Sequence, residues 1–334
     1  MAPHRPTLEE VAQAAGVSRS TASRAINGGK RVSPTAQAAV DEAVKQLGFI
    51  PNRAARALAT SHTGSIALVI PEPDELFLSD PFLTGVLRGV SGALAGSDTQ
   101  LILLIAQRGQ APDRMTRYLN GGHVDGAIIT SLHRSDMIEQ QIRGHLPAVF
   151  IGRPFDSEGL TYVDTDNVAG GRLATRALLD AGRQRVATIS GPDDMTASLD
   201  RTSGWRLELQ EAGLPTDAIE SGMFTIPAAA QATHRLLEKY PDTDGIFVAS
   251  DTMAIGVRRA LGELGRRVPQ DVAIVGFDNL GLAGAMTPRL TTVNNPLVDM
   301  VGTATRMLLD RIAAPELHAE HVVITPTLVE GESI

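Results

Sequence analysis

Apolar residues at helical spacing divide the first fifty residues into three short predicted helices. Thr7 and Glu10 form a T-x-x-E capping box that starts the first helix. Leu8, Val11 and Ala12 then lie on one face of that helix. The pattern predicts a small all-α unit at the start of the chain.

The second predicted helix is unusual because polar residues crowd its outer face. Gly16 ends the first helix, Ser18 is placed to N-cap the second, and Ala22, Ala25 and Ile26 form its apolar face. The remaining positions carry short donors and acceptors: Arg19, Ser20, Ser23, Arg24 and Asn27. This helix-turn-helix pattern is typical of a helix that reads base edges in the major groove, with an ordinary solvated helix face as the alternative.

A third helix and a shorter fourth segment follow. Ser33 is an N-cap followed by proline at the first helical position, and Gly48 ends this helix. Residues 52–60 begin with another capping residue, Asn52, and carry one large apolar side chain, Leu58. Because so short a helix is unstable alone, we expect it to order only against a partner and a minor groove, with Leu58 as a wedge between base steps. A plain linker helix is the alternative.

From residue 64 onward, short apolar strands alternate with helices. Repeated β-α units predict parallel sheets covered by helices on both faces. The predicted strands are 65–70, 101–106, 126–130, 148–151, 185–190, 245–250, 272–277 and, last in the chain, 322–329. The predicted helices are 82–95, 112–120, 135–143, 167–181, 200–212, 228–239 and 252–264. We expect an α/β body of two doubly wound parallel-sheet lobes with a ligand cleft between them.

Charge divides the chain in a similar place. Residues 1–60 hold eight Lys and Arg against four Asp and Glu, a net charge of +4, whereas the whole chain carries −8, which leaves −12 for the rest. A basic segment on an acidic body is typical of a nucleic-acid-binding head, with chance clustering as the alternative. The predicted units are a helix-turn-helix head at 1–50, a short helix and linker at 51–62, and a two-lobed body at 63–334, with lobe 1 at about 63–162 and 293–320 and lobe 2 at about 163–290 and 321–334.

Composition and motifs exclude several other classes of protein. The chain has no cysteine, which excludes disulfides and thiolate metal sites. A polar N-terminus and apolar runs far below the ~18 residues of a membrane span predict a cytoplasmic protein that is associated with the nucleoid when bound to DNA. No nucleotide-binding glycine motif, H-E-x-x-H or G-x-S-x-G occurs, so we expect no metal, no cofactor and no enzymatic activity.

Six blocks of the sequence resemble the lactose-repressor (LacI) family of bacterial transcription regulators, in that family's order and spacing. They are 8-LEEVAQAAGVSRSTASRAING-28, 31-RVSPTAQAAV-40, 47-LGFIPNRAARALAT-60, 164-DTDNVAGGRLATRALLDAG-182, 251-DTMAIGVRRAL-261 and 267-RVPQDVAIVGFDN-279. The resemblance implies a homodimer on a pseudo-palindromic operator, with recognition helices in the major groove and paired hinge helices in the minor groove. It also implies a periplasmic-binding-protein-like body with an effector between its lobes.

The resemblance assigns DNA contacts position by position. Arg19 and Ser20 hold the places that read bases, and Leu58 holds the intercalating place of the hinge. The expected DNA-binding residues are Leu8, Ser18, Arg19, Ser20, Ser23, Arg24, Asn27, Arg31, Ser33, Asn52, Arg53, Ala55 and Leu58.

Charged and aromatic residues at the ends of predicted strands and the starts of helices mark the expected effector cleft. Aromatic rings with Asp and Arg suit a sugar, because its CH faces stack and its neighbouring hydroxyls take bidentate hydrogen bonds. The expected effector-binding residues are Asp80, Phe82, Arg153, Asp166, Arg201, Phe224, Ser250, Asp251 and Asp278. As alternatives, Asp166 and Asp251 cap their helices and Phe82 belongs to the core.

The stretches 123-HVDGAIITSLHRSD-136 and 191-GPDDM-195 are similar to actinobacterial regulators of cello-oligosaccharide use. Met195 stands where purine-responsive members of the family carry a polar contact. We therefore expect a gluco- or cello-oligosaccharide inducer that changes the lobe angle, separates the hinge helices and releases the operator. A solute receptor of a transporter, an enzyme on the same fold and a regulator with a non-sugar corepressor are the alternatives.

Overall fold

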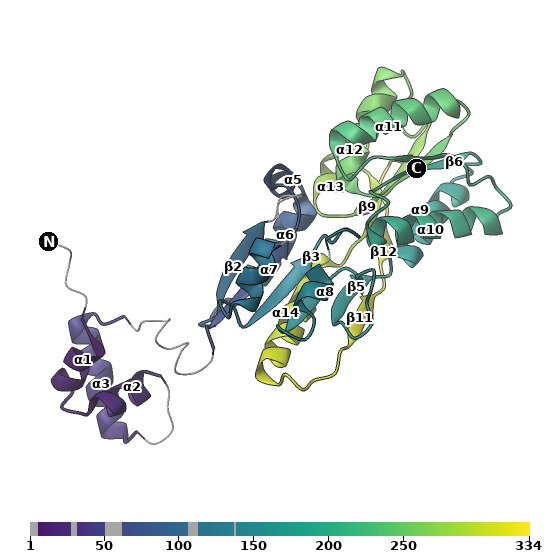
Figure 1. Ribbon diagram of the computed structural model, residues 1–334. Helices are drawn as coiled ribbons and strands as arrows, with labels where there is room; N and C mark the ends of the chain where they lie inside the picture. The colour runs from purple at the N-terminus through teal and green to yellow at the C-terminus, as the bar shows by residue number, and fades with distance from the viewer. Residues whose placement is uncertain (1–5, 28–31, 51–61, 106–112, 137) are drawn as a thin grey trace. The chain divides into compact units, whose positions relative to one another are not determined.

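The computed structural model of the protein describes residues 6–27, 32–50, 62–105, 113–136 and 138–334 (Figure 1). The chain separates into two compact units, Met1–Gly64 and Ser65–Ile334. Five residues predicted to contact DNA lie outside the described residues: Arg31, Asn52, Arg53, Ala55 and Leu58. No helix of the described part is long and apolar enough to cross a membrane.

The described part of the first unit is a three-helix head with a small apolar core. Its helices are α1 (Leu8–Ala14), α2 (Arg19–Ile26) and α3 (Pro34–Leu47). The predicted N-caps are present, since the side chains of Thr7, Ser18 and Ser33 each accept a hydrogen bond from a backbone N–H of the following helix. Gly16 permits the turn into α2 with a φ of 66°. The buried core residues are Val11, Ala12, Ala22, Ala25, Val40 and Ala43.

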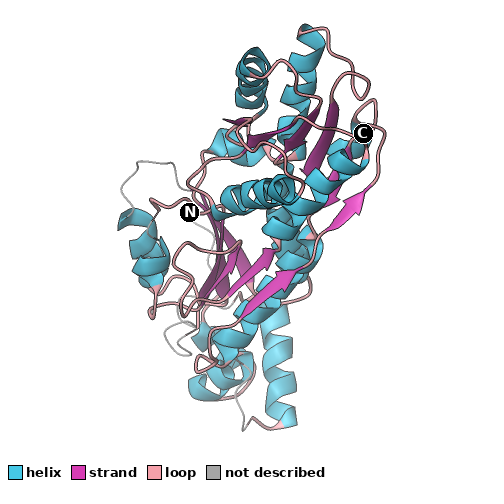
Figure 2. Cartoon of the chain, turned by 90° about the vertical axis from the view of Figure 1, so that its right-hand side faces the viewer, coloured by secondary structure: helices cyan, strands magenta, loops and turns pink. Residues whose placement is uncertain are grey.

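The second unit contains two six-stranded sheets with helices on both faces (Figure 2). The first sheet has the order β11-β5-β4-β3-β1-β2 and the second has the order β12-β10-β9-β8-β6-β7. All recorded strand pairs are parallel except β10 with β12. We name the first sheet with its helices lobe 1 and the second lobe 2. The strands of lobe 1 are β1 (Ser65–Ile70), β2 (Gln100–Ile105), β3 (Gly126–Thr130), β4 (Ala148–Ile151), β5 (Tyr162–Thr165) and β11 (His321–Ile324). The strands of lobe 2 are β6 (Val186–Ser190), β7 (Ile219–Ser221), β8 (Gly245–Val248), β9 (Ala273–Asp278), β10 (Thr291–Asn294) and β12 (Thr327–Val329).

Helices bury the two faces of each sheet in separate apolar clusters. In lobe 1, α6 and α14 contribute to one cluster and α7 and α8 to the other; in lobe 2, α9 and α10 contribute to one and α11 and α12 to the other. The helices of lobe 1 are α5 (Asp74–Ser79), α6 (Pro81–Ala93), α7 (Asp113–Asn120), α8 (Ile138–Ile142) and α14 (Leu297–Ala313). The helices of lobe 2 are α9 (Asn167–Asp180), α10 (Thr196–Glu211), α11 (Ile226–Lys239), α12 (Asp251–Glu263) and α13 (Leu282–Ala285). Because both faces are covered, the central strands are continuous apolar runs, as the sequence pattern predicted.

Two glycines let α9 and α10 pack at close range. A Cβ atom on Gly204 would collide with the carbonyl oxygen of Val168, and a Cβ atom on Gly171 would collide with that of Arg201. This contact fixes the start of α10, which carries Arg201, against lobe 2. Only glycine allows the two backbones to approach so closely.

The strand pairing corrects the predicted lobe limits. Lobe 2 was expected to begin at residue 163 and lobe 1 to resume at 293, but β5 pairs with β4 in the first sheet and β10 pairs with β9 in the second. The predicted last strand, 322–329, is two strands: β11 pairs with β5 in lobe 1, and β12 pairs with β10 in lobe 2. Pro326 separates them, because proline has no N–H to continue a ladder. Three segments of the chain therefore cross between the lobes, after β5, after β10 and after β11.

Candidate functional site

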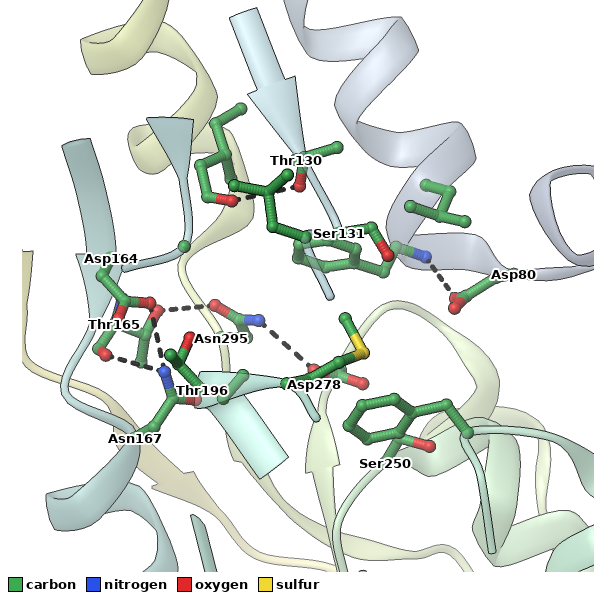
Figure 3. Close-up of a pocket in the computed structure, with 18 of the residues that line it drawn as sticks. Asp80, Thr130, Ser131, Asp164, Thr165, Asn167, Thr196, Ser250, Asp278 and Asn295 are labelled. Carbon is green, nitrogen blue, oxygen red and sulfur yellow. Dashed lines mark hydrogen bonds between the residues drawn. The ribbon is translucent and has the colours of Figure 1, made fainter. Parts of the chain in front are cut away.

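A pocket lies between the two lobes of the body. The space between its walls is about 850 Å³, which includes space open to solvent. Many of its side chains come from the carboxyl ends of parallel strands, where ligands bind in sheets of this kind. Figure 3 labels ten polar residues that line it: Asp80, Thr130, Ser131, Asp164, Thr165, Asn167, Thr196, Ser250, Asp278 and Asn295.

Seven of the nine predicted effector residues line this pocket. They are Asp80, Phe82, Arg153, Arg201, Phe224, Ser250 and Asp278. Both lobes contribute to this set, so the fold brings together side chains that are far apart in the sequence. Phe82 lines the pocket and also packs at the edge of the lobe 1 core, and its contact with an effector stays a prediction.

Asp166 and Asp251 do not line the pocket, which corrects the predicted set. Asp166 is the N-cap of α9, where its carboxylate accepts a backbone N–H at 2.8 Å. Asp251 is buried, and its two oxygens accept from the Thr292 hydroxyl at 2.7 Å and from the Asn279 N–H at 2.8 Å. The N-cap of α12 is Ser250, not Asp251. Both aspartates therefore stabilise local structure instead of facing the pocket.

Arg201 is a buried charged group of the pocket, with 6% of its surface exposed. Its Nε donates to Asn167 Oδ1 at 2.9 Å, and its Nη1 donates to the carbonyl oxygen of Ala249 at 2.6 Å. Its Nη2 lies 3.5 Å from Asp278 Oδ1, and its guanidinium lies 3.7 Å from the centre of the Phe277 ring. Burial lowers the pKa of Arg201, and Asp278 is the strongest opposing influence. Binding of a ligand to the planar guanidinium of Arg201 costs little side-chain entropy, because these contacts already hold the group in one orientation.

A chain of hydrogen bonds joins the lobe crossings to the pocket (Figure 3). Thr165, at the end of β5, donates through Oγ1 to Asn295 Oδ1 at 2.7 Å, and Asn295 Nδ2 donates to Asp278 Oδ1 at 3.3 Å. Asn167 Nδ2 donates to Asp164 Oδ1 at 3.1 Å. Thr165 and Asn295 belong to two of the segments that cross between the lobes, so a ligand bound to Asp278 contacts a group that is hydrogen-bonded to a crossing segment.

Strained backbone gathers at the pocket. The non-glycine residues with positive φ in the described ranges are Ser131 (59°), Met223 (53°), Phe224 (53°), Asp278 (113°) and Asn279 (53°). Three of them line the pocket and the other two are their sequence neighbours. Each such conformation costs ~1–3 kcal/mol and persists only where the surroundings hold it. The Phe224 ring lies against Gly191, where a Cβ atom would collide with it, so the bare glycine leaves room for the ring at the pocket.

Burial changes the proton affinity of the pocket carboxyls. It raises the pKa of Asp80 to about 7, although the Phe82 N–H that Asp80 accepts at 2.9 Å opposes the change. It also raises the pKa of Asp164 to about 6, and it raises that of Asp278 against the opposing effect of Arg201. Such carboxyls can donate as well as accept hydrogen bonds near neutral pH, which suits hydroxyl groups. Within the described ranges, no cluster of three His, Cys, Asp or Glu is placed to hold a metal ion.

Polar contacts tie the lobes together at the pocket. Arg153 Nη2 of lobe 1 lies 2.7 Å from Asp200 Oδ2 of lobe 2, and Thr196 Oγ1 donates to the carbonyl oxygen of Arg153 at 2.6 Å. The His133 ring of lobe 1 lies 2.8 Å from Asp194 Oδ1 of lobe 2. Arg153 and Thr196 therefore both line the pocket and join the lobes.

Sequence reasoning missed a second group of pocket residues. Glu72 follows β1 and Ser131 follows β3, so the strand-end rule that selected Ser250 could have found both. Asp164 lies within β5 and Asn295 follows β10, and neither of these short strands was predicted. Their role depends on the lobe crossings, which local sequence patterns do not reveal.

The outer face of α2 is exposed, as expected for a DNA-binding helix. Arg19, Ser20 and Arg24 are exposed; Arg19 Nε pairs with Glu9 at 2.6 Å, and Arg24 Nε donates to the Ser20 carbonyl oxygen at 3.1 Å. The Arg19 side chain is 70% exposed, so this pair costs little to break. Its guanidinium is thus available to a base or phosphate.

Other predicted DNA-binding residues of the head also have structural roles. The hydroxyls of Ser18 and Ser33 accept the N-cap hydrogen bonds of α2 and α3, and Leu8 packs against the head core. Asn27 is the C-cap of α2, and its Nδ2 donates to Ser23 Oγ at 3.4 Å. Their contact with DNA stays a prediction.

Comparisons with known proteins agree with this architecture. Residues 7–52 match the family described as bacterial regulatory proteins, lacI family, and residues 175–334 match the periplasmic binding protein-like domain. The chain is 42% identical to the HTH-type transcriptional regulator CelR of Thermobifida fusca over 334 residues, which cover 98% of each chain. A solved CelR–cellobiose complex has a TM-score of 0.79 and 40% identity, with 99% of this chain and 100% of that chain covered. The lac repressor dimer bound to operator and the anti-inducer ONPF has a TM-score of 0.86 at 24% identity, with 99% of each chain covered, a likeness of fold. The predicted fold class and family are confirmed: the chain belongs to the LacI family of bacterial transcription regulators.

Proposed function

We propose that the protein acts in the cytoplasm as a homodimeric repressor that binds a pseudo-palindromic operator and is released by a neutral gluco- or cello-oligosaccharide. The observation that carries the proposal is the inter-lobe pocket, which presents Arg201 and buried carboxyls beside the Phe82 and Phe224 side chains. The relative CelR, which is similar over nearly the whole chain, has been solved with cellobiose. The activity proposed for this chain is binding and release of DNA, with no chemical step.

Charge in the pocket favours an uncharged ligand. Four acidic residues line it, Glu72, Asp80, Asp164 and Asp278, against two arginines, Arg153 and Arg201. Both arginines are already within 4 Å of carboxylates, since Arg153 pairs with Asp200 and Arg201 lies beside Asp278. A phosphate or carboxylate would add negative charge to this surplus at a cost in free energy. Neutral hydroxyls, in contrast, find both donors and acceptors.

The lobe crossings supply a route from the sugar to the DNA. A ligand that contacts Asp278 or Asp164 acts on groups that are hydrogen-bonded at Thr165, Asn295 and Asn167, at or beside the crossings. A change in lobe angle then alters the separation of the hinge segments that precede lobe 1 in each subunit. The sugar shifts this equilibrium only by its difference in affinity for the two lobe arrangements.

A gel-shift and anisotropy experiment tests the proposal. The full-length protein is titrated against duplexes that tile the region upstream of its own gene, with a scrambled duplex as control, at two salt concentrations. We expect one fragment to bind in preference to the scrambled duplex and cellobiose to weaken that binding. If no fragment is preferred, the proposal that the protein binds an operator in this region is wrong. If neither cellobiose nor longer cello-oligosaccharides change the binding, the proposed effector is wrong.

A corepressor would have the opposite sign in the same experiment. If an added sugar strengthens operator binding, the repressor-release part of the proposal is wrong and the sugar acts as corepressor. Size-exclusion chromatography with light scattering on the same preparation tests the dimer.

A further inference from the structure

His133 connects the pocket wall of lobe 1 to lobe 2 through both nitrogens of its ring. Its Nε2 lies 2.8 Å from Glu72 Oε1, and its Nδ1 lies 2.8 Å from Asp194 Oδ1. Its side chain is 1% exposed, so water does not compete for either contact. Glu72 lines the pocket from the end of β1, whereas Asp194 lies in lobe 2 between β6 and α10. The imidazole therefore bridges a pocket carboxyl and the opposite lobe.

The hydrogen bonds around this bridge fix the number of protons it needs. Ser131 Oγ donates to Glu72 Oε1 at 2.7 Å, so this oxygen acts as an acceptor, and His133 Nε2 must then be a donor to it. The Asp194 side chain is 39% exposed, so water solvates its carboxylate, and His133 Nδ1 must also donate to it. A neutral imidazole carries one N–H, whereas this geometry uses two. A bridge between two ionised carboxylates therefore requires an imidazolium.

Other charged groups around the ring agree with this assignment. Asp136 Oδ2 accepts the backbone N–H of His133 at 2.7 Å, which places a third carboxylate near the ring. The next residue, Arg134, donates its backbone N–H to the carbonyl oxygen of Asp194 at 2.9 Å, and its guanidinium lies over an aromatic ring. That backbone bond is a second contact between the two lobes beside His133. The carboxylates of Glu72, Asp194 and Asp136 stabilise a positive charge on it.

We propose that His133 is a positioning residue that couples lobe closure to the uptake of one proton. When the lobes approach around a ligand, Asp194 meets His133, and the bridge forms in its doubly protonated state. His133 does not line the pocket, but it contacts Glu72, which does, and Glu72 in turn accepts a hydrogen bond from the pocket residue Ser131. By linkage, an event that takes up a proton becomes less favourable as pH rises. The effector should therefore bind more weakly in alkaline solution, and repression should resist the sugar there.

The inference uses cellobiose as a probe and so depends on the proposed function, but its test separates the two. Calorimetry of cellobiose binding to the full-length protein in two buffers of different ionisation enthalpy gives the protons taken up on binding. We expect uptake near one proton at about pH 7.5, and a dissociation constant that rises about 10- to 100-fold between about pH 6.5 and about pH 8.5. His133→Gln, which cannot carry charge, should lower both effects. The exposed His145 of the same lobe is the matched control, and His145→Gln should behave as the wild type.

Asp80 and Asp164 also line the pocket, and the pKa values of both are raised toward neutrality. Both remain in His133→Gln, so the difference between wild type and variant isolates the bridge. Asp194→Asn is the second variant, because its side chain is partly exposed and lies outside the pocket lining, and it should lose the same proton uptake. Equal proton uptake in wild type, His133→Gln and Asp194→Asn would overturn the inference.

If cellobiose does not bind, that result counts against the proposed function and not against the His133 bridge. A measurement without sugar then tests the bridge. In sugar-free protein labelled with 15N-histidine, the His133 signals, identified by their loss in His133→Gln, should report two protonated nitrogens at about pH 6 and a neutral ring at about pH 8. At about pH 6 they should move toward a neutral ring in Asp194→Asn. A singly protonated ring in the wild type at about pH 6, unchanged in Asp194→Asn, would contradict the bridge.

Discussion

Replacing Arg201 by lysine tests whether the fixed guanidinium organises the pocket. The substitution keeps a positive charge but removes the planar guanidinium, whose Nε and Nη1 donate hydrogen bonds to Asn167 and to the carbonyl oxygen of Ala249. A single ammonium can reach one of these acceptors and leaves the other buried without its donor. Hydrogen bonds of charged groups contribute ~1.5–3 kcal/mol each to the stability of the folded state, and a buried acceptor left without a donor adds a desolvation cost. We therefore expect Arg201→Lys to lower the free energy of unfolding of lobe 2 by about 2–4 kcal/mol.

Urea denaturation followed by tryptophan fluorescence measures this loss. The chain has one tryptophan, Trp205, which is fully buried one turn after Arg201 on α10 and reports on the same lobe. Arg206→Lys is the matched control, because Arg206 is exposed on the same helix and its replacement should change stability by less than about 0.5 kcal/mol.

Sugar affinity gives the second readout of the same variant. Loss of the guanidinium should weaken cellobiose binding about 10- to 100-fold in calorimetry, measured where the variant is still folded. If Arg201→Lys is as stable as Arg206→Lys and binds cellobiose with wild-type affinity, the buried network around Arg201 does not organise the pocket.

Further substitutions test other parts of the structure. Gly191→Ala should displace the Phe224 ring and weaken sugar binding about tenfold in calorimetry, and an unchanged affinity would show that the ring does not contact the sugar. Gly204→Ala should lower the free energy of unfolding by about 1–3 kcal/mol in the same urea assay, because α9 and α10 must separate; wild-type stability would contradict the close approach. Arg19→Ala should weaken operator binding by about 1–3 kcal/mol in anisotropy titrations without changing head stability, and an equal loss on scrambled DNA would indicate a phosphate contact instead of base reading. Asp80→Asn should remove part of the pH dependence of stability. The pKa of Asp80 is raised in the folded state to about 7, so the wild type loses stability as pH rises from about 4 to about 7, and urea curves for the variant should be flatter over that range.

Local patterns predicted most of the fold because its elements follow simple rules. The caps at Thr7, Ser18 and Ser33 and the buried strands β1, β3 and β9 were visible as short sequence signals, and the structure has them where the pattern placed them. The short strands β5, β7 and β10 were not predicted. Each has three or four residues and no clear alternation, so neighbouring strands define it more than its own sequence does. The tail was misassigned for the same reason, since only the pairing shows that Pro326 divides it between two sheets.

The candidate site was predictable where side chains follow strands, and not where they depend on tertiary pairing. Arg201 and Asp278 were identified from position and family resemblance, and both line the pocket. Asp251 was placed in the site because it begins a helix at a strand end, but its carboxylate turns to Thr292 and Asn279 instead. Asn295 carried no local signal, because its importance comes from joining a lobe crossing to Asp278.

The most direct test of the account measures operator affinity and sugar binding on one preparation of full-length protein. Labelled operator is bound to the protein at fixed salt, and cellobiose is titrated while anisotropy is followed. We predict that the sugar lowers operator affinity about 5- to 150-fold, with a midpoint governed by the dissociation constant found by calorimetry, and that Arg201→Lys shifts that midpoint to higher sugar concentration. Operator affinity that stays constant or rises while calorimetry shows the pocket filled would contradict the account.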